Sequence, residues 1–138
     1  MQDRFLFMLS KIQNKLSSHI RRKLKEQGVV LSPGQMGILL ALENEKQTTM
    51  GELSRILEID NAAITRLVDK LEKLDFVERQ INLKDRRQML ITITSSGMAS
   101  ASIVKTVVQS ANNKIKEGFT KEEMDIYKRV NVSLLDKF

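Results

Sequence analysis

The 138-residue chain lacks several residue types on which common functional sites depend. It has no cysteine, which excludes disulfide bonds, thiolate metal ligands and thiol redox sensing. A single histidine argues against a histidine-based metal site. The absence of tryptophan, with only one tyrosine, argues against the stacking platforms of RNA-binding proteins. One proline and six glycines favour long helices over a loop-rich β protein. We therefore expect no metal and no cofactor.

The chain also lacks an apolar run long enough to cross a membrane. Its N-terminal apolar cluster is interrupted by Asp3, Arg4 and Lys11, and it does not resemble a signal peptide. These features predict a cytoplasmic protein with no membrane partner. Apolar residues make up 41% of the chain, which is enough for the core of one domain together with elements that pack only on a partner.

The net charge of +6 favours a polyanionic partner, but this charge is unevenly distributed. Residues 48–93 carry eight basic and eight acidic side chains and are neutral overall. Residues 1–27 carry seven basic and two acidic side chains. Total charge therefore does not establish nucleic-acid binding. The local excess lies in residues 79–87, which hold four basic residues and one acidic residue.

Long amphipathic helices are predicted at both ends of the chain. Apolar residues recur at intervals of three and four over residues 3–27, and Gly28 is suited to end that helix. Two further helices are expected over residues 95–117 and, behind a capping box at Thr120, over residues 120–137. A monomer of this length has too little core to bury all these apolar stripes, so they predict a symmetric homodimer. The expected interface residues are Phe5, Leu9, Ile12, Leu16, Tyr127, Val130, Leu134 and Leu135.

Three helix starts follow one another in the middle of the chain. Ser32 and the proline after it are typical of the first turn of a helix. Thr49 begins a second capping-box pattern and predicts a short helix. Asp60 or Asn61 caps the next helix. The inward face of that helix is predicted to consist of Ile64, Leu67, Val68, Leu71 and Leu74.

Two strand-like segments, residues 76–81 and 89–93, flank a polar segment long enough for a hairpin loop. Helix, turn, helix and hairpin in this order predict a winged helix-turn-helix with a two-stranded wing. The expected fold class is mostly α (α+β). The predicted parts are an N-terminal dimerisation helix (residues 1–31), a winged helix-turn-helix domain (32–95) and C-terminal dimerisation helices (96–138).

The second helix of a helix-turn-helix can enter the major groove of DNA, where base edges show a distinct pattern of donors and acceptors. Asparagine can pair with adenine and arginine with guanine, while alanine and the threonine methyl suit a thymine methyl. The DNA contacts predicted on this helix are Asn61, Ala62, Ala63, Thr65, Arg66 and Lys70. Thr49 and Arg55, from the preceding helix, are also predicted to contact DNA. An ordinary solvated helix start fits these residues equally well.

The hairpin loop favours DNA binding. Arginine at a hairpin tip suits the narrow minor groove, so Arg86 or Arg87 could insert there, and Lys84 could lie over phosphate. Asp85 would repel DNA, so we expect it to brace Arg87 or Arg79 by a paired hydrogen bond. The alternative is a charged hairpin that only keeps the protein soluble. A matching helix-turn-helix before the hairpin makes that alternative the weaker one.

Three segments of the chain together resemble the MarR family of transcriptional regulators, namely LSPGQMGILLAL, TMGELSRIL–IDNAAITRLVDKLEKLDFVER and RQINLKDRRQMLITITSSG. The resemblance covers essentially the whole chain. Its most specific part is Arg79, five residues, and then Asp85-Arg86-Arg87. The resemblance implies an obligate homodimer, formed by the first, fifth and sixth helices, that binds a pseudo-palindromic operator and usually represses. It assigns Arg87 to the minor groove and residues 61–66 to the recognition helix.

The resemblance also implies a ligand pocket between the dimerisation helices and the DNA-binding domain. Members that sense peroxide use a cysteine in the first helix, and members that bind zinc use several histidines; this chain has no cysteine and only His19. A small amphipathic or phenolic anion remains, or no ligand at all. The candidate lining residues are His19, Arg22, Met36 and Leu40. An exposed position on the first helix is the more common situation for such a histidine.

The sequence thus predicts a transcriptional regulator whose partner is double-stranded DNA. The alternative is a winged-helix protein-interaction module without DNA binding, and the neutral charge of residues 48–93 agrees with it. An enzyme is the least supported class, because the chain has no cysteine, no pair of histidines and no glycine-rich phosphate loop.

Overall fold

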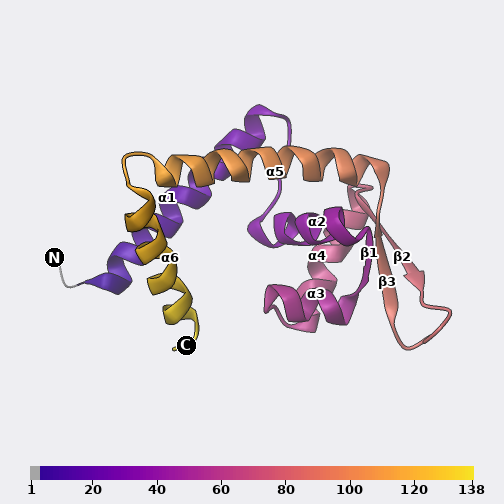
Figure 1. Cartoon of the computed structure of the whole chain (residues 1–138). Helices are drawn as coiled ribbons and strands as arrows, with labels where there is room; N and C mark the ends of the chain where they lie inside the picture. The colour runs from indigo at the N-terminus through magenta and orange to yellow at the C-terminus, as the bar shows by residue number, and fades with distance from the viewer. Residues whose placement is uncertain (1–3) are drawn as a thin grey trace.

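The computed structural model describes residues 4–138, which form an arch (Figure 1). The long helix α5 (Ser95–Lys116) spans the top and joins the two ends of the arch. One end consists of α1 (Phe5–Glu26) and α6 (Lys121–Leu135). The other end holds α2 (Pro33–Glu45), α3 (Met50–Leu57), α4 (Asn61–Lys73) and a small sheet. The predicted mostly helical fold with a winged helix-turn-helix is confirmed. The predicted first residue of α1, at position 3, lies outside the described residues.

The sheet has three antiparallel strands in the order β1-β3-β2. The predicted hairpin consists of β2 (Val77–Ile81) and β3 (Met89–Ile93), paired from Val77 opposite Ile93 to Ile81 opposite Met89. The prediction of a two-stranded wing missed β1 (Gln47–Thr49), which pairs with β3. Three polar residues are too short a segment to show strand alternation. This strand connects α2 to α3 and so holds the start of α3 beside the hairpin.

A single hydrophobic core joins the helix-turn-helix to the flanking helices. Leu24 of α1 and Val104 of α5 are as fully buried as Leu39 of α2 and Ile64 of α4. The inward face of α4 is as predicted at Ile64, Val68 and Leu71, with Leu67 half-buried beside Gly34. The prediction for Leu74 was wrong: α4 ends at Lys73, and Leu74, as the C-cap, is 46% exposed. None of the helices in residues 4–138 combines the length and apolarity needed to cross a membrane.

The turn after α4 makes a close junction with the start of α5. The amide of Thr94 donates to the Phe76 carbonyl (3.0 Å), and the Thr94 hydroxyl donates to the Asp75 carbonyl (2.6 Å). The same hydroxyl accepts a bond from the amide of Gly97 (2.9 Å) and so caps α5. A Cβ atom on Gly97 would lie 2.0 Å from the Phe76 carbonyl oxygen, so only glycine fits here.

Replacing Gly97 with alanine should therefore lower the free energy of unfolding by about 1–3 kcal/mol, because the Phe76 backbone would have to move. Urea unfolding at a fixed protein concentration measures the change. Gly51→Ala in α3 is the matched control, because nothing lies within 4 Å of a Cβ atom there. An unchanged urea midpoint for Gly97→Ala would contradict the close approach.

Candidate nucleic-acid interface

The first turn of α4 presents polar and small residues on the molecular surface. Asp60 is the N-cap, and its carboxylate accepts a hydrogen bond from the amide of Ala63 (2.8 Å), which leaves Asn61 as the first helical residue. The Thr65 hydroxyl donates to the carbonyl of Asn61 (2.8 Å), so its polar group is used within the helix. Asn61, Ala62, Thr65, Arg66 and Lys70 are exposed, and Ala63 is half-buried.

The first turn of α3 lies next to that of α4. Thr49 is its N-cap, and the hydroxyl accepts from the amide of Glu52 (3.1 Å). The return bond of the predicted capping box is not formed, because the Glu52 carboxylate accepts from Nε of Arg55 instead (3.0 Å). That hydrogen bond lowers the pKa of Glu52 and raises the pKa of Arg55. Arg55 is thus already partnered.

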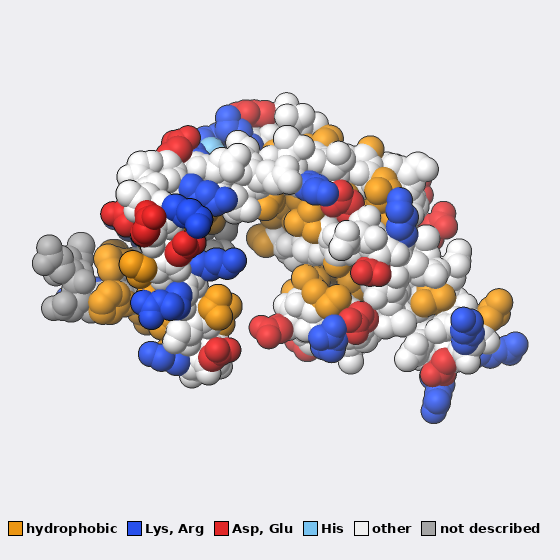
Figure 2. Space-filling view, in the orientation of Figure 1, with side chains coloured by type: hydrophobic (Ala, Val, Ile, Leu, Met, Phe, Trp, Pro, Cys, Tyr) orange, Lys and Arg blue, Asp and Glu red, His pale blue; other side chains and the backbone are white. Residues whose placement is uncertain are grey.

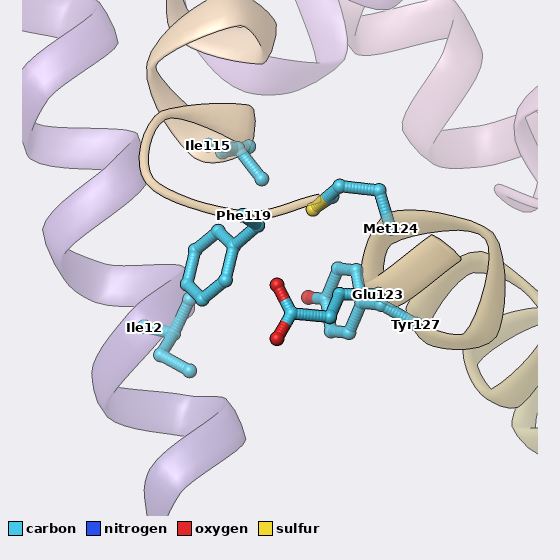
Figure 3. A pocket seen from close by; sticks show the side chains of 6 residues that line it. All are labelled: Ile12, Ile115, Phe119, Glu123, Met124 and Tyr127. Carbon is cyan, nitrogen blue, oxygen red and sulfur yellow. The ribbon is translucent and has the colours of Figure 1, made fainter. Parts of the chain in front are cut away.

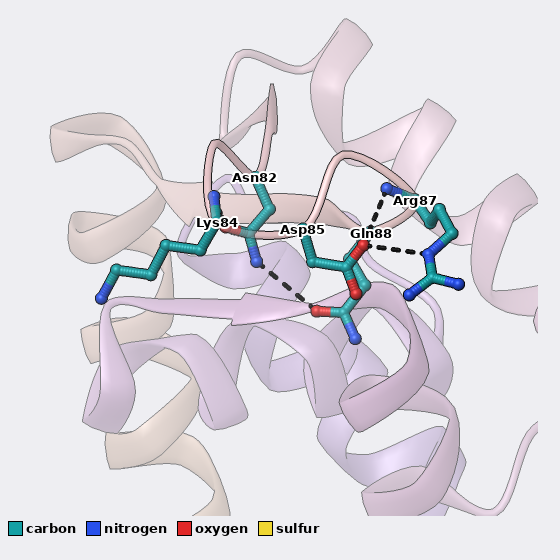
Figure 4. Close-up of polar contacts among 5 residues, drawn as sticks. All are labelled: Asn82, Lys84, Asp85, Arg87 and Gln88. Atoms are coloured by element: carbon teal, nitrogen blue, oxygen red, sulfur yellow. Dashed lines mark hydrogen bonds and ion pairs between the residues drawn. The ribbon is translucent and has the colours of Figure 1, made fainter.

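The hairpin loop is closed by a network of short-range hydrogen bonds (Figure 4). The amide of Asn82 donates to the Gln88 carbonyl (3.1 Å), and the Asn82 side chain accepts from the amide of Lys84 (3.0 Å). One carboxylate oxygen of Asp85 accepts from both the amide and Nε of Arg87, each at 3.2 Å. The predicted brace by Asp85 therefore acts on Arg87. The Arg87 side chain remains 92% exposed, and Lys84 extends to the other side of the loop in Figure 4.

These three elements enclose one hollow of about 420 Å³, which we call the interface hollow. Its lining residues are Thr49, Met50, Gly51, Asn61, Thr65, Arg79, Arg87, Gln88 and Met89. Four of the predicted DNA contacts, from α3, α4 and the hairpin, are thus brought to a single concave surface. Lys84 and Arg86 lie exposed beyond it in the hairpin loop.

Arg79 is the lining residue whose position was least expected. Its side chain is only 23% exposed, and it pairs with the carboxylates of Asp69 and Glu72 on α4 rather than with Asp85. The sequence did contain a signal for this arrangement. Strand alternation places position 79 on the same face as Val77, which is buried, and a charged residue facing inward needs a partner.

The four residues predicted for a ligand pocket fall into two pairs. His19 and Arg22 contact each other on α1, with Nδ1 and Nη2 3.3 Å apart. Met36 and Leu40 are partly buried against the core from α2. Neither pair lines the interface hollow. Desolvation, followed by the nearby cations Lys114, Arg22 and Lys23, lowers the pKa of His19 below its ordinary value.

An apolar groove of about 460 Å³ lies between α1, α5 and α6 (Figure 3). In Figure 3, Ile12 and Phe119 lie on one side of it, and Glu123 and Tyr127 enter from α6 on the other side. Apolar side chains are also exposed at this end of the arch (Figure 2), and α6 has no buried residue. Exposure is 68% for Phe5, 49% for Tyr127 and 46% for both Leu9 and Val130.

Comparison with known proteins finds a similar family for the central part of the chain. The model of the MarR family matches residues 31–89, a span that includes α2, α3, α4, β2 and the hairpin loop. This part of the chain is therefore similar to the MarR family. The matched span contains the whole interface hollow, whose residues all lie between Thr49 and Met89.

Two curated relatives illustrate the range of similarity. The HTH-type transcriptional regulator SarZ of Staphylococcus haemolyticus is 30% identical over 82 residues, which are 59% of this chain and 53% of SarZ. The HTH-type transcriptional repressor YetL of Bacillus subtilis is 28% identical over 137 residues, which are 92% of this chain and 79% of YetL. The match thus spans about half the length of SarZ and most of YetL.

Solved structures share the fold over nearly the whole chain. One is a mutant of MarR from E. coli complexed with operator DNA. It has a TM-score of 0.82 and 22% sequence identity, and the match covers 93% of this chain and 91% of that chain. At this identity the likeness establishes the winged-helix architecture and the placement of the flanking helices.

The lowered pKa of His19 can be tested by titration. In the folded protein His19 should titrate below about 6.5, and Lys114→Gln should raise its pKa because one repelling charge is removed. Folded stability should fall as the pH drops from about 6.5 toward the folded pKa, because protonation is easier in the unfolded chain. His19→Gln should abolish that part of the pH dependence. Nuclear magnetic resonance titration of the imidazole is the direct measurement; an unshifted His19 in both proteins would contradict the cluster.

Proposed function

We propose that this protein belongs to the MarR family and is a sequence-specific DNA-binding transcriptional regulator that binds a pseudo-palindromic operator as a homodimer and acts as a repressor. The observation that carries the proposal is the interface hollow, in which Thr49, Asn61, Thr65 and Arg87 converge from three separate elements. The names of SarZ and YetL support a regulatory function. Because its partner is chromosomal DNA, we expect the protein to act in the cytoplasm.

In this proposal α4 occupies the major groove. Its exposed first turns offer an amide at Asn61 and a guanidinium at Arg66, which match adenine and guanine edges respectively. The Thr65 hydroxyl is bonded to the helix backbone, so its methyl group is the part suited to a thymine methyl. The small side chain of Ala62 permits close approach of the helix.

The hairpin supplies the minor-groove contact. Arg87 is almost fully exposed, and the hydrogen bond from its Nε to Asp85 orients the guanidinium. A guanidinium on a narrow projecting loop suits the negative potential of a narrow minor groove. Lys84 and Arg86, exposed on the same loop, are suited to the flanking phosphates.

Phosphate contacts from α3 would set the register of the protein on DNA. Thr49 caps the first turn, and at Gly51 no atom would lie within 4 Å of a Cβ atom, so the backbone there is open to approach. Backbone amides at a helix start favour anions. Arg55 and Lys70 lie exposed on the adjoining surfaces of α3 and α4 and would add contacts to the DNA backbone.

The homodimer would be formed by α1, α5 and α6. Helix α6 buries no residue within its own subunit, yet the side chains of Tyr127, Val130 and Leu135 are largely apolar and are 49%, 46% and 79% exposed. A second copy related by two-fold symmetry would cover these residues together with Phe5, Leu9, Ile12, Leu16 and Leu134. Two copies of α4 would then enter successive major grooves, about 34–36 Å apart.

A small amphipathic or phenolic anion would act as the effector. Arg22, Lys23 and Lys114 give the region around His19 a positive potential, and Met36 and Leu40 offer an apolar surface from α2. Such an anion would bind more tightly to a state in which the spacing of the two α4 helices does not match the operator. It would then lower operator affinity in proportion to the difference between its own affinities for the two states.

A protein-interaction module without DNA binding is the second candidate, favoured by the neutral charge of residues 48–93 and by Leu83, which is 85% exposed in the hairpin loop. Three of the acidic residues in this span, Glu52, Asp69 and Glu72, are paired with arginines within the protein. The neutral total therefore does not describe the charge of each exposed surface. Salt dependence separates the two candidates. Operator binding should weaken steeply with salt, whereas an interaction module should have no DNA affinity even at low salt. The proposal includes no catalytic step.

Selection of bound duplexes from a random pool should recover a palindromic motif, which then serves as the operator probe. Arg87→Ala should weaken binding to that probe by about 1–3 kcal/mol without changing the thermal midpoint, because the Arg87 side chain is 92% exposed. Fluorescence anisotropy at fixed salt measures the affinity. Arg21→Ala, an equal change of charge on α1, is the control. Equal affinity of Arg87→Ala and the unchanged protein would refute the minor-groove contact.

Val130→Glu should convert the dimer into a monomer, because it places a charge in the centre of the apolar face of α6. Sedimentation velocity gives the mass directly. Val30→Glu is the matched control, because Val30 is also apolar and exposed (74%) but lies between α1 and α2. If Val130→Glu stayed dimeric, the interface would have to lie elsewhere.

A further inference from the structure

We propose that Arg79 is a positioning residue: it fixes the angle of the hairpin on α4, so that Arg87 and the start of α4 reach the two grooves of one duplex together. The inference rests on the proposed DNA-binding function and deepens it. It assigns a role to an arginine that the prediction of DNA contacts left out. The same arrangement gives Asp69 and Glu72, two carboxylates near the proposed DNA surface, a reason to be there.

The contacts of Arg79 cross from the hairpin to α4. One terminal nitrogen of its guanidinium pairs with the carboxylate of Asp69, and Nε lies 3.6 Å from a carboxylate oxygen of Glu72. Positions 69 and 72 are three residues apart and therefore share one face of α4. A single guanidinium from the middle of β2 thus meets two carboxylates from the C-terminal part of α4.

The link differs from an ordinary surface ion pair at its Arg79 end, whereas the Asp69 and Glu72 side chains are 46% and 45% exposed. The Arg79 side chain is 23% exposed, and its Nε is buried without a hydrogen bond among the described residues. A partly desolvated ion pair is costly to break from one side, because the partner charge is left without compensation. The planar guanidinium also requires a defined approach of the carboxylates, so it restricts orientation as well as distance.

The location of the link determines what it can control. At one end of β2 the hairpin is already held by the junction of Phe76 with Thr94 and Gly97. At the other end the loop projects with Arg87 exposed. Arg79 lies between these points and links the hairpin to the C-terminal part of α4, the helix that carries Asn61 and Thr65 near its start. A change in this link would swing the loop relative to α4.

Removing negative charge near DNA ordinarily strengthens binding, but removing the carboxylates that hold Arg79 should weaken binding to the operator. The double variant Asp69→Asn/Glu72→Gln removes two negative charges from the vicinity of DNA, so binding to a non-specific duplex should be unchanged or tighter. Binding to the selected operator should nevertheless weaken by about tenfold, because the groove contacts are no longer made together. Arg79→Gln should weaken operator binding by a similar factor, and the triple variant should be no worse than either, because the three residues act as one unit.

Glu78→Gln is the matched control. It removes a negative charge from the adjacent position of β2, where the side chain is exposed and makes no ion pair among the described residues. All affinities are measured by anisotropy at several salt concentrations, well below each variant's thermal midpoint. Operator binding by the double variant that is equal to or tighter than that of the unchanged protein would overturn the proposal. So would an Arg79→Gln variant that loses operator and non-specific affinity equally and reduces the salt slope by about one, which is the signature of a direct phosphate contact.

A second measurement needs no DNA. Because the chain has no cysteine, Leu83→Cys provides a single labelling site in the hairpin loop, at a residue that is 85% exposed. A nitroxide there should become more mobile when Arg79→Gln or Asp69→Asn/Glu72→Gln is added, and should be unaffected by Glu78→Gln. Unchanged mobility in both linked variants would overturn the positioning role. If the unchanged protein bound no DNA while the label responded as expected, the proposed function would fail and the mechanical link would stand.

Discussion

The whole arrangement depends on the junction at Phe76, where the carbonyl oxygen accepts the amide of Thr94 and meets the bare Cα of Gly97. Four elements, α4, β2, β3 and α5, come together at this point. The junction leaves no room for a side chain, so the long helix α5 departs from the sheet at a fixed position. In the proposed homodimer, a change in the spacing of the two subunits that moves α5 would therefore also move the surface that holds the interface hollow.

The winged domain is neutral overall, but the placement of its charges gives it a basic hairpin loop. The carboxylates of Glu52, Asp69 and Glu72 are engaged by Arg55 and Arg79. The remaining cations of the hairpin loop, Lys84 and Arg86, extend into solvent, and Arg87 does so while braced by Asp85. Some of the charged residues thus hold α3, α4 and the hairpin in place, and others remain exposed for the proposed contact with DNA.

Much of this architecture could be predicted from sequence, because helix caps and apolar periodicity are local signals. Thr120 and Ser32 both form the full capping box, and Asp60 caps α4. The hairpin and the brace by Asp85 could also be predicted, since the donor and acceptor are only two residues apart. These features need no knowledge of the tertiary structure.

The parts that could not be predicted depend on contacts distant in sequence. Strand β1 exists only because Thr48 meets Ile91 on β3. Arg79 reaches α4 rather than Asp85 because the hairpin folds back onto that helix. The Glu52 carboxylate accepts from Arg55 instead of from the backbone amide of Thr49, which would complete the capping box. Both partners are close in sequence, so the capping-box pattern alone does not show which one is chosen. The groove lined by Ile12 and Phe119 forms because α1 lies beside α5 and α6, which are distant from it in the sequence.

The central claim is that α4 and the hairpin contact two grooves of one duplex at the same time. Dimethyl sulfate footprinting tests it directly, because the reagent reports guanine N7 in the major groove and adenine N3 in the minor groove. The account predicts two blocks of N7 protection about one helical turn apart, each with N3 protection on its outer side, and predicts that only the N3 protection is lost when Arg87 is replaced by alanine. Major-groove protection with no minor-groove protection, or a single block, would contradict it.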